Sequence, residues 1–389
     1  MRKPLIVIAI LAVLMATMTP IFTPGKGQGD FLAYWAAARL MISGGNPYDL
    51  DAMTLIQEQN RPNGETQNDL LTSWNPPWLS LILIPFAGLP FQWAAIVWMF
   101  TNILLVGLSI LITLDLSGYS LDKMEFLWSL LTCLFFGETI ALLNLGQIGS
   151  LVLLSVLLSV RLIRDKRDWL AGGVLLFSTI KPHLVYLVLF FIFLWVIYNK
   201  RWSIVASFLL TGLAAIGISS LIFPGWIPAY LNLLLSTQFG TLYTSTIGSF
   251  FSNVAGIQGF QYLGVLSFPL AIPLLKNFSK LGWVTILNIA WLVSVSLGPY
   301  GFTFDQVVLL PTLVQMVAWL VNIPFSRRFR YLVISALVSG NLVLLAMLFQ
   351  PALDYYWFFW TPFFLLFIYI IIFIKVIKQN KPLQANLGY

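Results

Sequence analysis

The sequence predicts an all-α polytopic membrane protein, and three features of its composition support that fold class. Charged residues make up only 9% of the 389 positions, whereas they make up about 25% of a soluble domain. Hydrophobic residues make up 59%, and several apolar runs exceed the roughly 18 residues that indicate a transmembrane helix. Aromatic residues reach 15%, as expected where Trp and Tyr gather at the membrane–water interface. The lipid bilayer is therefore the expected solvent for most of the chain.

Thirteen apolar segments are candidates for crossing the membrane. Short basic clusters lie between them, and because such clusters stay on the cytoplasmic side, we expect both termini in the cytoplasm. Two cytoplasmic termini require an even number of crossings. The segment 78–90 is the expected exception, because it is short and contains Pro85, so we predict about twelve transmembrane helices. The thirteen segments are 5–21, 78–90, 91–116, 126–143, 147–164, 169–180, 183–198, 203–223, 262–275, 281–299, 305–322, 331–349 and 357–378.

The chain is expected to form one integral-membrane domain, 1–389. Its first segment, 5–21, resembles a signal peptide without a small-residue cleavage site, which predicts an uncleaved anchor. The first loop on the outer face is predicted to carry juxtamembrane helices at 30–42 and 51–59, joined by the turn SGGNPYD. The predicted outer loops are 22–90 and 224–261, and the predicted cytoplasmic C-terminal tail is 379–389.

Several classes of function are excluded by what the sequence lacks. One His and one Cys cannot build a His/Cys metal site, and neither a Walker A motif nor a Rossmann glycine fingerprint is present. Asp49 and Asp51 form a D-x-D pattern of the kind that holds a metal and a nucleotide sugar, but no α/β nucleotide fold is predicted around them. The net charge of +7 comes from basic clusters between apolar runs, so we expect no nucleic-acid partner.

Asp30 lies just after the first apolar segment, in the stretch GQGDFLAYW. Tyr34 follows four residues later and shares its helix face, and Trp35 comes next. A carboxylate at the membrane surface, with partners that set its pKa, suits a general base. The alternative is a helix N-cap, a position that Asp favours. This stretch alone leaves both roles open.

Lys181 and His183 interrupt an apolar stretch between two basic clusters. One continuous helix would bury Lys181 near the middle of the membrane, where charge is costly, and Pro182 would break that helix. We therefore predict two short helices that meet at these residues and present them to a cavity on the outer side. Lys is a compact cationic ligand for phosphate, and His can donate to the same oxygens. The alternative is a lysine at a helix end that reaches the interface.

Further polar residues lie at the predicted outer ends of helices. Each fits a cap or a turn as well as it fits a cavity that binds the sugar or the acceptor. With Tyr34 and Trp35, they make up the predicted sugar and acceptor cavity. They are Asn75 before a Pro-Pro break, Asn144 and Gln147 at a helix junction, and Asp305 at the start of an apolar segment.

The order of these motifs resembles glycosyltransferase family 87. The resemblance covers about residues 27–320. The family is similar to the wider GT-C class of multi-helix membrane glycosyltransferases, and it includes mannosyltransferases that extend phosphatidylinositol mannosides. In chain order the motifs are G-x-G-D-F-x-x-Y, G-x-N-P-Y, N-P-P-W, L-G-Q, K-P and G-P-Y-x-F-x-x-D-Q-V-x-L-L-P.

The resemblance implies a GT-C-like fold and an inverting glycosyltransferase of the cell membrane. It implies a polyprenyl-phosphate-linked donor of a mannose-like hexose, a lipid or glycan acceptor, and an active site on the extracytoplasmic side. Asp30 would be the catalytic base, Lys181 and His183 would bind the donor phosphate, and Gln147 would line the cavity. No cofactor and no metal ligand is expected, and the metal requirement stays open.

Two other functions stay open at this point. A lipid or oligosaccharide transporter or flippase would share the fold class. Such a protein is expected to carry inverted repeats and polar groups at the membrane midplane, and we detect neither in the sequence. A ligase of another polyprenyl-linked glycan would share the chemistry.

Overall fold

The computed structural model describes residues 29–60, 71–119, 123–237, 243–350 and 352–379. Within these ranges the regular structure is helical and no strand occurs, which confirms the predicted all-α class. The predicted anchor, 5–21, and residues 380–389 of the predicted tail lie outside the described residues.

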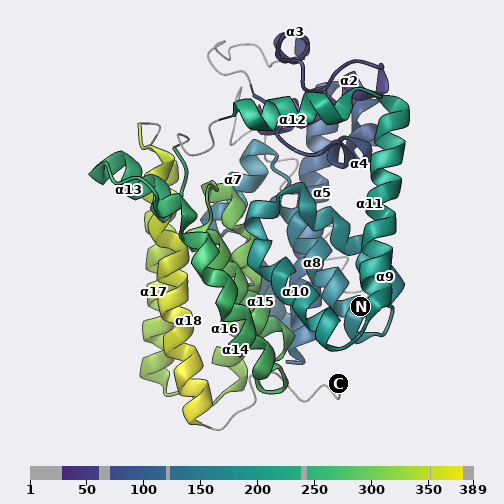
Figure 1. Ribbon diagram of the computed structural model, residues 1–389. Helices are drawn as coiled ribbons and strands as arrows, with labels where there is room; N and C mark the ends of the chain where they lie inside the picture. The colour runs from purple at the N-terminus through teal and green to yellow at the C-terminus, as the bar shows by residue number, and fades with distance from the viewer. Residues whose placement is uncertain (1–28, 61–70, 120–122, 238–242, 351, 380–389) are drawn as a thin grey trace.

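Six helices in the described part of the chain are long and apolar enough to cross a membrane (Figure 1). They make the protein a multi-pass membrane protein. They are α5 (Phe91–Ser117), α11 (Trp202–Ile222), α15 (Phe278–Leu297), η5 (Thr303–Leu309) with α16 (Leu310–Asn322), α17 (Arg327–Leu348), and η6 (Tyr355–Phe359) with α18 (Trp360–Lys378).

The predicted segment 126–143 is a broken pair of helices. The bend between α6 (Lys123–Leu134) and α7 (Gly137–Leu145) measures 57°. Asn341 of α17 pairs the backbone at the break, accepting from the Gly137 N–H at 2.9 Å and donating to the Phe135 carbonyl at 3.1 Å. The pair counts as a seventh crossing only if both halves traverse the bilayer together.

The remaining apolar segments are shorter, and the number of twelve crossings stays a prediction. α4 (Pro77–Ala87) has 11 residues, or about 16 Å of helix, which is short of the roughly 30 Å hydrocarbon core. The predicted segment 262–275 consists of η4 (Phe260–Leu270) and α14 (Ala271–Lys276). The others are α8 (Gly149–Arg164), α9 (Asp168–Leu175), η1 (Leu176–Ile180), η2 (Pro182–Leu184), α10 (Tyr186–Tyr198), α12 (Trp226–Ser236) and α13 (Ile247–Ala255).

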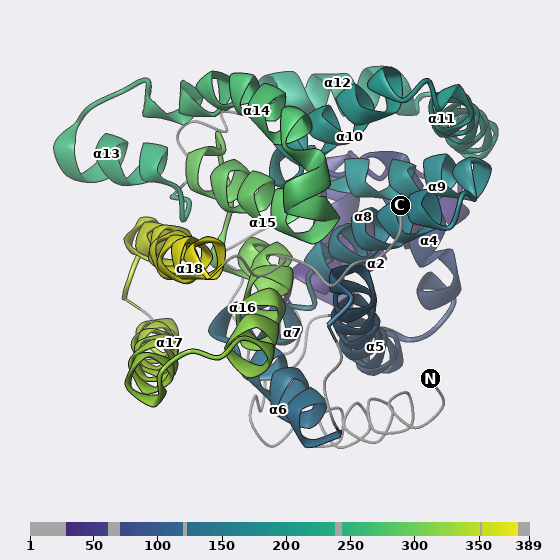
Figure 2. The ribbon, with the colours of Figure 1, turned by 90° about the horizontal axis from the view of Figure 1, so that it is seen from below.

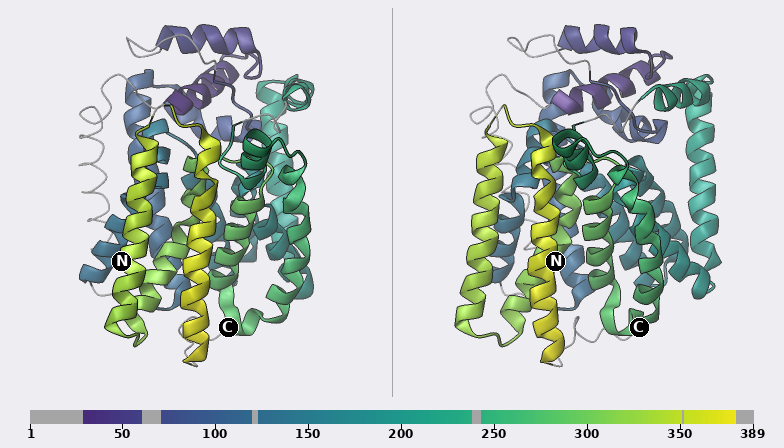
Figure 3. Two further views of the ribbon diagram at one scale, coloured as in Figure 1. Left: turned by 90° about the vertical axis from the view of Figure 1, so that its left-hand side faces the viewer. Right: turned by 60° about the vertical axis from the view of Figure 1, so that its left-hand side comes forward.

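The segment predicted to be the first outer loop contributes α2 (Gly29–Ile42) and α3 (Leu50–Asn60), close to the two predicted ranges. These helices lie with α4 and α12 at one end of the bundle, across the ends of the long helices (Figures 1 and 3). α2 packs against α4, and ten of its fourteen residues are buried. This packing gives the polar groups of α2 a fixed place at that end.

The centre of the bundle is formed by α16, whose side chains are nearly all buried, whereas α11 and α17 are largely exposed. The Gln315 side chain of α16 accepts hydrogen bonds from Asn288 of α15 at 2.7 Å and from Tyr369 of α18 at 2.6 Å. It also donates to Thr285 at 2.9 Å. Polar contacts of this kind hold helices together in lipid, where burial of apolar surface supplies little driving force.

α9 and α11 approach closely at Gly172, where an added Cβ would overlap the carbonyl oxygen of Ile204. We expect Gly172→Ala to destabilise the protein by about 1–3 kcal/mol, the usual cost of overpacking, because the atoms in the way are backbone. Gly217 on α11 is the matched control, since a Cβ there meets no atom within 4 Å. Thermal unfolding in detergent measures the difference. Equal unfolding temperatures for the two variants would contradict the close approach.

Candidate active site

A chain of polar contacts connects α2 with the break between η1 and η2. Asp30, half-buried in the first turn of α2, accepts a hydrogen bond from the Gln147 side-chain amide, with Nε2 and Oδ2 2.6 Å apart. Lys181 Nζ donates to Gln147 Oε1 at 2.7 Å and to Asp305 Oδ1 at 2.6 Å. The fold thus joins four of the predicted site residues into one chain of side chains.

Gln147 is held by a rigid turn between α7 and α8. α7 ends at Gly146, which has φ of +67°, a backbone conformation that glycine adopts at little cost. Two fully buried side chains of α5 hold the carbonyls of this turn: Trp98 donates to Gly146 at 2.7 Å, and Asn102 donates to Gln147 at 3.0 Å. The Gln147 side chain therefore enters the site from a fixed backbone.

Lys181 is placed by the proline that follows it. Pro182 has no N–H to continue a helix and disfavours the helical conformation in the residue before it. Lys181 accordingly has φ of −132° and ψ of 76°. Asn75 donates its side-chain amide to the Ile180 carbonyl at 3.0 Å, which pairs a backbone group at the break. The predicted meeting of two short helices at this point is confirmed.

The orientation of the Gln147 amide follows from its neighbours. An ammonium group only donates hydrogen bonds, so Lys181 has to face the amide oxygen. The Tyr34 hydroxyl donates to the same oxygen at 3.0 Å. The amide NH₂ therefore faces Asp30, whose Oδ2 accepts the bond. This contact leaves Oδ1 of Asp30 for another donor.

Asp305 holds the far end of the chain of contacts and is only 2% exposed. Its Oδ2 accepts from the Phe302 backbone N–H at 3.0 Å. His183 Nε2 lies 3.7 Å from the same oxygen, which is too long for a hydrogen bond. The His183 ring lies against Tyr300, with centroids 4.0 Å apart, and its two nitrogens have no hydrogen-bond partner among the described residues. His183 therefore keeps its donor capacity for a ligand.

The electrostatic surroundings make Asp30 a stronger base than an ordinary aspartate. Burial is the largest effect and raises the pKa of Asp30 above its usual value of 3.8. The hydrogen bond from Gln147 and the charge of Lys181 lower the pKa in part, and the charge of Asp305 raises it again. Because a general base works best when its pKa approaches the working pH, this shift favours proton abstraction.

A comparison with protein families assigns the chain. The glycosyltransferase family 87 profile matches residues 74–351, more than two thirds of the chain. This protein belongs to glycosyltransferase family 87. The predicted family is thereby confirmed, and the protein is a membrane glycosyltransferase. No curated protein and no solved structure matches the chain.

The family-87 match covers only part of the chain of polar contacts. Gln147, Lys181 and Asp305 lie inside the matched region, as does His183. α2 lies before it, so the place of Asp30 in the site depends on the geometry described above. Within the described residues, no three His, Cys, Asp or Glu side chains gather as metal ligands.

Three residues of the predicted sugar and acceptor cavity lie outside the chain of contacts. Trp35 donates its indole N–H to the carbonyls of Phe86 and Leu89, at 3.2 Å each, so it ties α2 to the end of α4. Asn75 supports the break before Lys181, as described above. Asn144 is exposed on α7. Their roles in a sugar cavity stay predictions.

The acidic pair of the first loop also has a structural role. Asp49 Oδ1 accepts hydrogen bonds from the backbone N–H groups of Asp51 and Ala52, both at 3.0 Å. These contacts cap the first turn of α3. They agree with the low weight that the sequence gives to a metal-binding D-x-D motif at this position.

Two tyrosines belong to the site but were not predicted. Tyr300 packs on His183, and it could have been found in the motif GPYGF, which also leads to Asp305. Tyr355 of η6 interacts electrostatically with Asp30 and packs edge-on against Phe302, with centroids 5.4 Å apart. Nothing in the aromatic run around Tyr355 marks it in the sequence, because its place depends on contacts with residues far away in the chain, such as Phe302.

Proposed function

We propose that this family-87 enzyme transfers a mannose-like hexose from a polyprenyl-phosphate-linked donor to a lipid or glycan acceptor at the outer face of the cell membrane. The observation that carries the proposal is the chain Asp30–Gln147–Lys181–Asp305. It places a carboxylate and an ammonium group in one site with a single amide between them. Transfer from a sugar phosphodiester needs both groups, a base for the attacking hydroxyl and a cation for the departing phosphate.

In the proposed reaction, Asp30 takes the proton of the acceptor hydroxyl. The hydroxyl oxygen forms a bond to the anomeric carbon while the bond from that carbon to the phosphate oxygen breaks. The electron pair of the broken bond leaves with the polyprenyl phosphate. Because the hydroxyl attacks opposite the leaving group, the anomeric configuration inverts. Tyr34 and Gln147 orient the base.

Lys181 and His183 stabilise the charge that grows on the departing phosphate. An ammonium group has three donor protons, and Lys181 uses two of them on Gln147 and Asp305. The third is available to a phosphate oxygen, as is the ring N–H of His183, whose nitrogens have no partner among the described residues. Fixed donors in a site with little water stabilise developing charge strongly. No cofactor takes part in the proposed reaction.

The extracytoplasmic placement rests on the basic clusters. Lys375 and Lys378 end α18 at the opposite end of the bundle from α2 (Figure 1). Arg327 and Arg328 begin α17 at that same end. Because basic residues stay on the cytoplasmic side of membranes, these clusters support the proposed placement of the Asp30 end at the outer face.

The chain of contacts favours the enzyme over a transporter. A transporter binds its cargo near the membrane midplane, whereas Asp30 and its partners gather where α2 crosses the end of the bundle. A ligase of another polyprenyl-linked glycan remains the closest alternative, because it would use the same base and the same phosphate contact.

The test is incubation of purified protein with a panel of polyprenyl-phosphate sugars and candidate acceptors, scored for release of polyprenyl phosphate. We expect release with a mannose-like donor, and the Asp30→Asn protein serves as the inactive control. A parallel reaction with a chelator answers the question of a metal. If the protein consumes no donor but moves labelled lipid between the leaflets of reconstituted vesicles, the transporter hypothesis replaces the enzyme hypothesis.

The raised pKa of Asp30 predicts the pH dependence of transfer. Asp30 acts as a base only when deprotonated, so kcat/KM should fall as the pH drops through its folded-state pKa, which lies above the ordinary 3.8. The measurement is kcat/KM for the donor across the acidic range. An acidic limb at or below the ordinary pKa of an aspartate, or the same limb in Asp30→Asn, would contradict this assignment.

A further inference from the structure

Three aromatic side chains form a row beside the candidate active site. This aromatic row consists of Phe304, Phe302 and Tyr355. The rings of Phe304 and Phe302 stack, with centroids 5.2 Å apart and an angle of 19° between their planes. Tyr355 meets Phe302 edge-on, with centroids 5.4 Å apart and an angle of 83°. The row therefore connects η5, which carries Asp305, with η6 at the start of α18.

One end of the aromatic row lies at Lys181 and the other end lies near Asp30. Lys181 Nζ is over the Phe304 ring, 5.1 Å from its centroid, which is within the range of a cation–π interaction. Tyr355 interacts electrostatically with Asp30. Both views of Figure 3 place the yellow connection that leads into α18 beside the purple helix α2. The row therefore spans the same interval, from base to cation, as the Gln147 amide.

The aromatic row is closed at Phe304 and open at Tyr355. Phe304 is 5% exposed and Tyr355 is 38% exposed, with Phe302 half-buried between them. No hydrogen bond joins the Tyr355 hydroxyl to the described part of the chain. In contrast, the Tyr34 hydroxyl and the Trp35 indole both donate to acceptors within the protein. Tyr355 therefore offers a ligand both a ring surface and a donor.

A hexose matches these two features of Tyr355. C–H groups cover one face of the sugar ring, and the electron-rich face of an aromatic ring attracts them. The sugar hydroxyls can accept a hydrogen bond from a phenol. In the proposed reaction the transferred sugar lies between the base and the departing phosphate, which is the interval that the aromatic row spans. The polyprenyl chain is attached beyond the phosphate, so the row is placed for the sugar and not for the chain.

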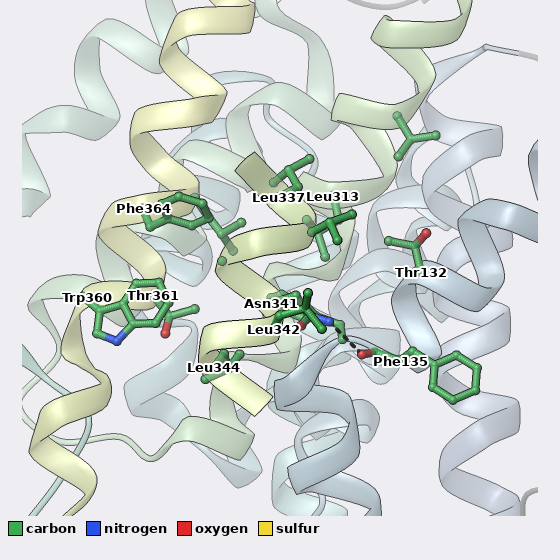
Figure 4. A pocket seen from close by; sticks show the side chains of 15 residues that line it. Thr132, Phe135, Leu313, Leu337, Asn341, Leu342, Leu344, Trp360, Thr361 and Phe364 are labelled. Carbon is green, nitrogen blue, oxygen red and sulfur yellow. Dashed lines mark hydrogen bonds between the residues drawn. The ribbon is translucent and has the colours of Figure 1, made fainter. Parts of the chain in front are cut away.

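A nearby cavity offers no alternative place for the sugar. It has a volume of about 210 Å³ and lies between α6, α16, α17 and α18 (Figure 4). It adjoins α17, which stands apart from α16 when the molecule is seen from below (Figure 2). Its walls are mostly Leu, Val and Phe side chains, and its one amide, Asn341, is already paired with the backbone at the α6–α7 break. These walls suit a hydrocarbon chain and leave the hydroxyls of a sugar without partners.

We propose that Phe302 and Tyr355 form the platform that holds the transferred hexose, with the Tyr355 hydroxyl donating to one of the sugar hydroxyls. Phe304 supports this platform and connects it to Lys181. The inference rests on the proposed function and adds the residues that position the sugar. The platform holds the anomeric carbon between the base and the phosphate ligands, and positioning of this kind raises the rate of transfer.

The test compares equilibrium binding of two lipids that differ only in the sugar. One is a polyprenyl phosphomannose, and the other is the methyl phosphodiester of the same polyprenol, which keeps the single negative charge. Tyr355→Leu should weaken binding of the mannosyl lipid and leave binding of the methyl lipid unchanged. Tyr355→Phe should weaken binding of the mannosyl lipid by about two- to ten-fold, the factor that corresponds to one hydrogen bond. Tyr356→Leu is the matched control, because Tyr356 lies on the same element but its ring is against Tyr243.

Deoxy analogues of the mannosyl lipid identify the sugar hydroxyl that Tyr355 binds. The analogue that lacks this hydroxyl should bind equally well to the wild-type protein and to Tyr355→Phe, because the bond is already absent. Thermal unfolding checks that each variant is folded. Unchanged binding of the mannosyl lipid in Tyr355→Leu, equal losses for both lipids, or an equal loss in Tyr356→Leu would each overturn the platform. If the wild-type protein binds neither lipid, the proposed function itself fails, and the platform fails with it.

Discussion

Asp30→Asn should reduce sugar transfer by on the order of 10²-fold or more, the usual contribution of a general base. Asn is nearly the same size as Asp, and its side-chain oxygen can still accept the hydrogen bond from Gln147. It cannot take a proton from the acceptor hydroxyl near neutral pH. The measurement is the transfer rate with saturating donor, compared with the wild-type protein.

The same variant distinguishes the base from a helix cap. Asn caps helices about as well as Asp, so a capping role predicts nearly normal turnover. Thermal unfolding and donor binding should both stay close to wild type, which ties the loss to chemistry. Normal transfer by a folded Asp30→Asn protein would remove the base from the mechanism.

Lys181→Met should reduce both stability and donor binding, because Lys181 has two kinds of partner. Removing the ammonium leaves the buried carboxylate of Asp305 without its cation, a change that typically costs about 3–5 kcal/mol. It also removes the proposed contact to the donor phosphate. Thermal unfolding and equilibrium binding of a polyprenyl-phosphate sugar measure the two effects separately.

The double variant Lys181→Met with Asp305→Asn assigns the two losses. With both charges removed, no unpaired ion remains in the site, so most of the stability should return. Donor binding should stay weak, because the phosphate still lacks its cation. If the double variant binds the donor as tightly as wild type, Lys181 serves the fold alone and does not contact the phosphate.

The sequence predicted those parts of the site that depend on local chemistry. Pro182 lacks an N–H, so the break beside Lys181 could be predicted from two neighbouring residues. The first-loop helices were predicted from turn residues and short apolar runs. The family could be predicted because its motifs keep their order along the chain.

The parts that were missed depend on contacts between distant segments. The bend between α6 and α7 contains no proline, and Asn341, 204 residues after Gly137, pairs the backbone groups that it exposes. Trp35 was predicted for the cavity, but its indole finds carbonyl acceptors at the end of α4. The pairing of Lys181 with Asp305 depends on how η5 packs against α8, which no local pattern encodes.

The ion pair between Lys181 and Asp305 has a consequence for the order of events during synthesis. The two residues are 124 positions apart, so at about 5–20 residues per second the ribosome needs roughly 6–25 s to make the partner of Lys181. An uncompensated lysine costs about 2.5–3.5 kcal/mol at the centre of a bilayer on insertion scales, and less toward the end of the bundle, where Lys181 lies. Until Asp305 arrives, the half-helices that carry Lys181 are therefore held in lipid less firmly than in the complete protein. We therefore expect Lys181 to stay in contact with water at the membrane surface until η5, which carries Asp305, has been made.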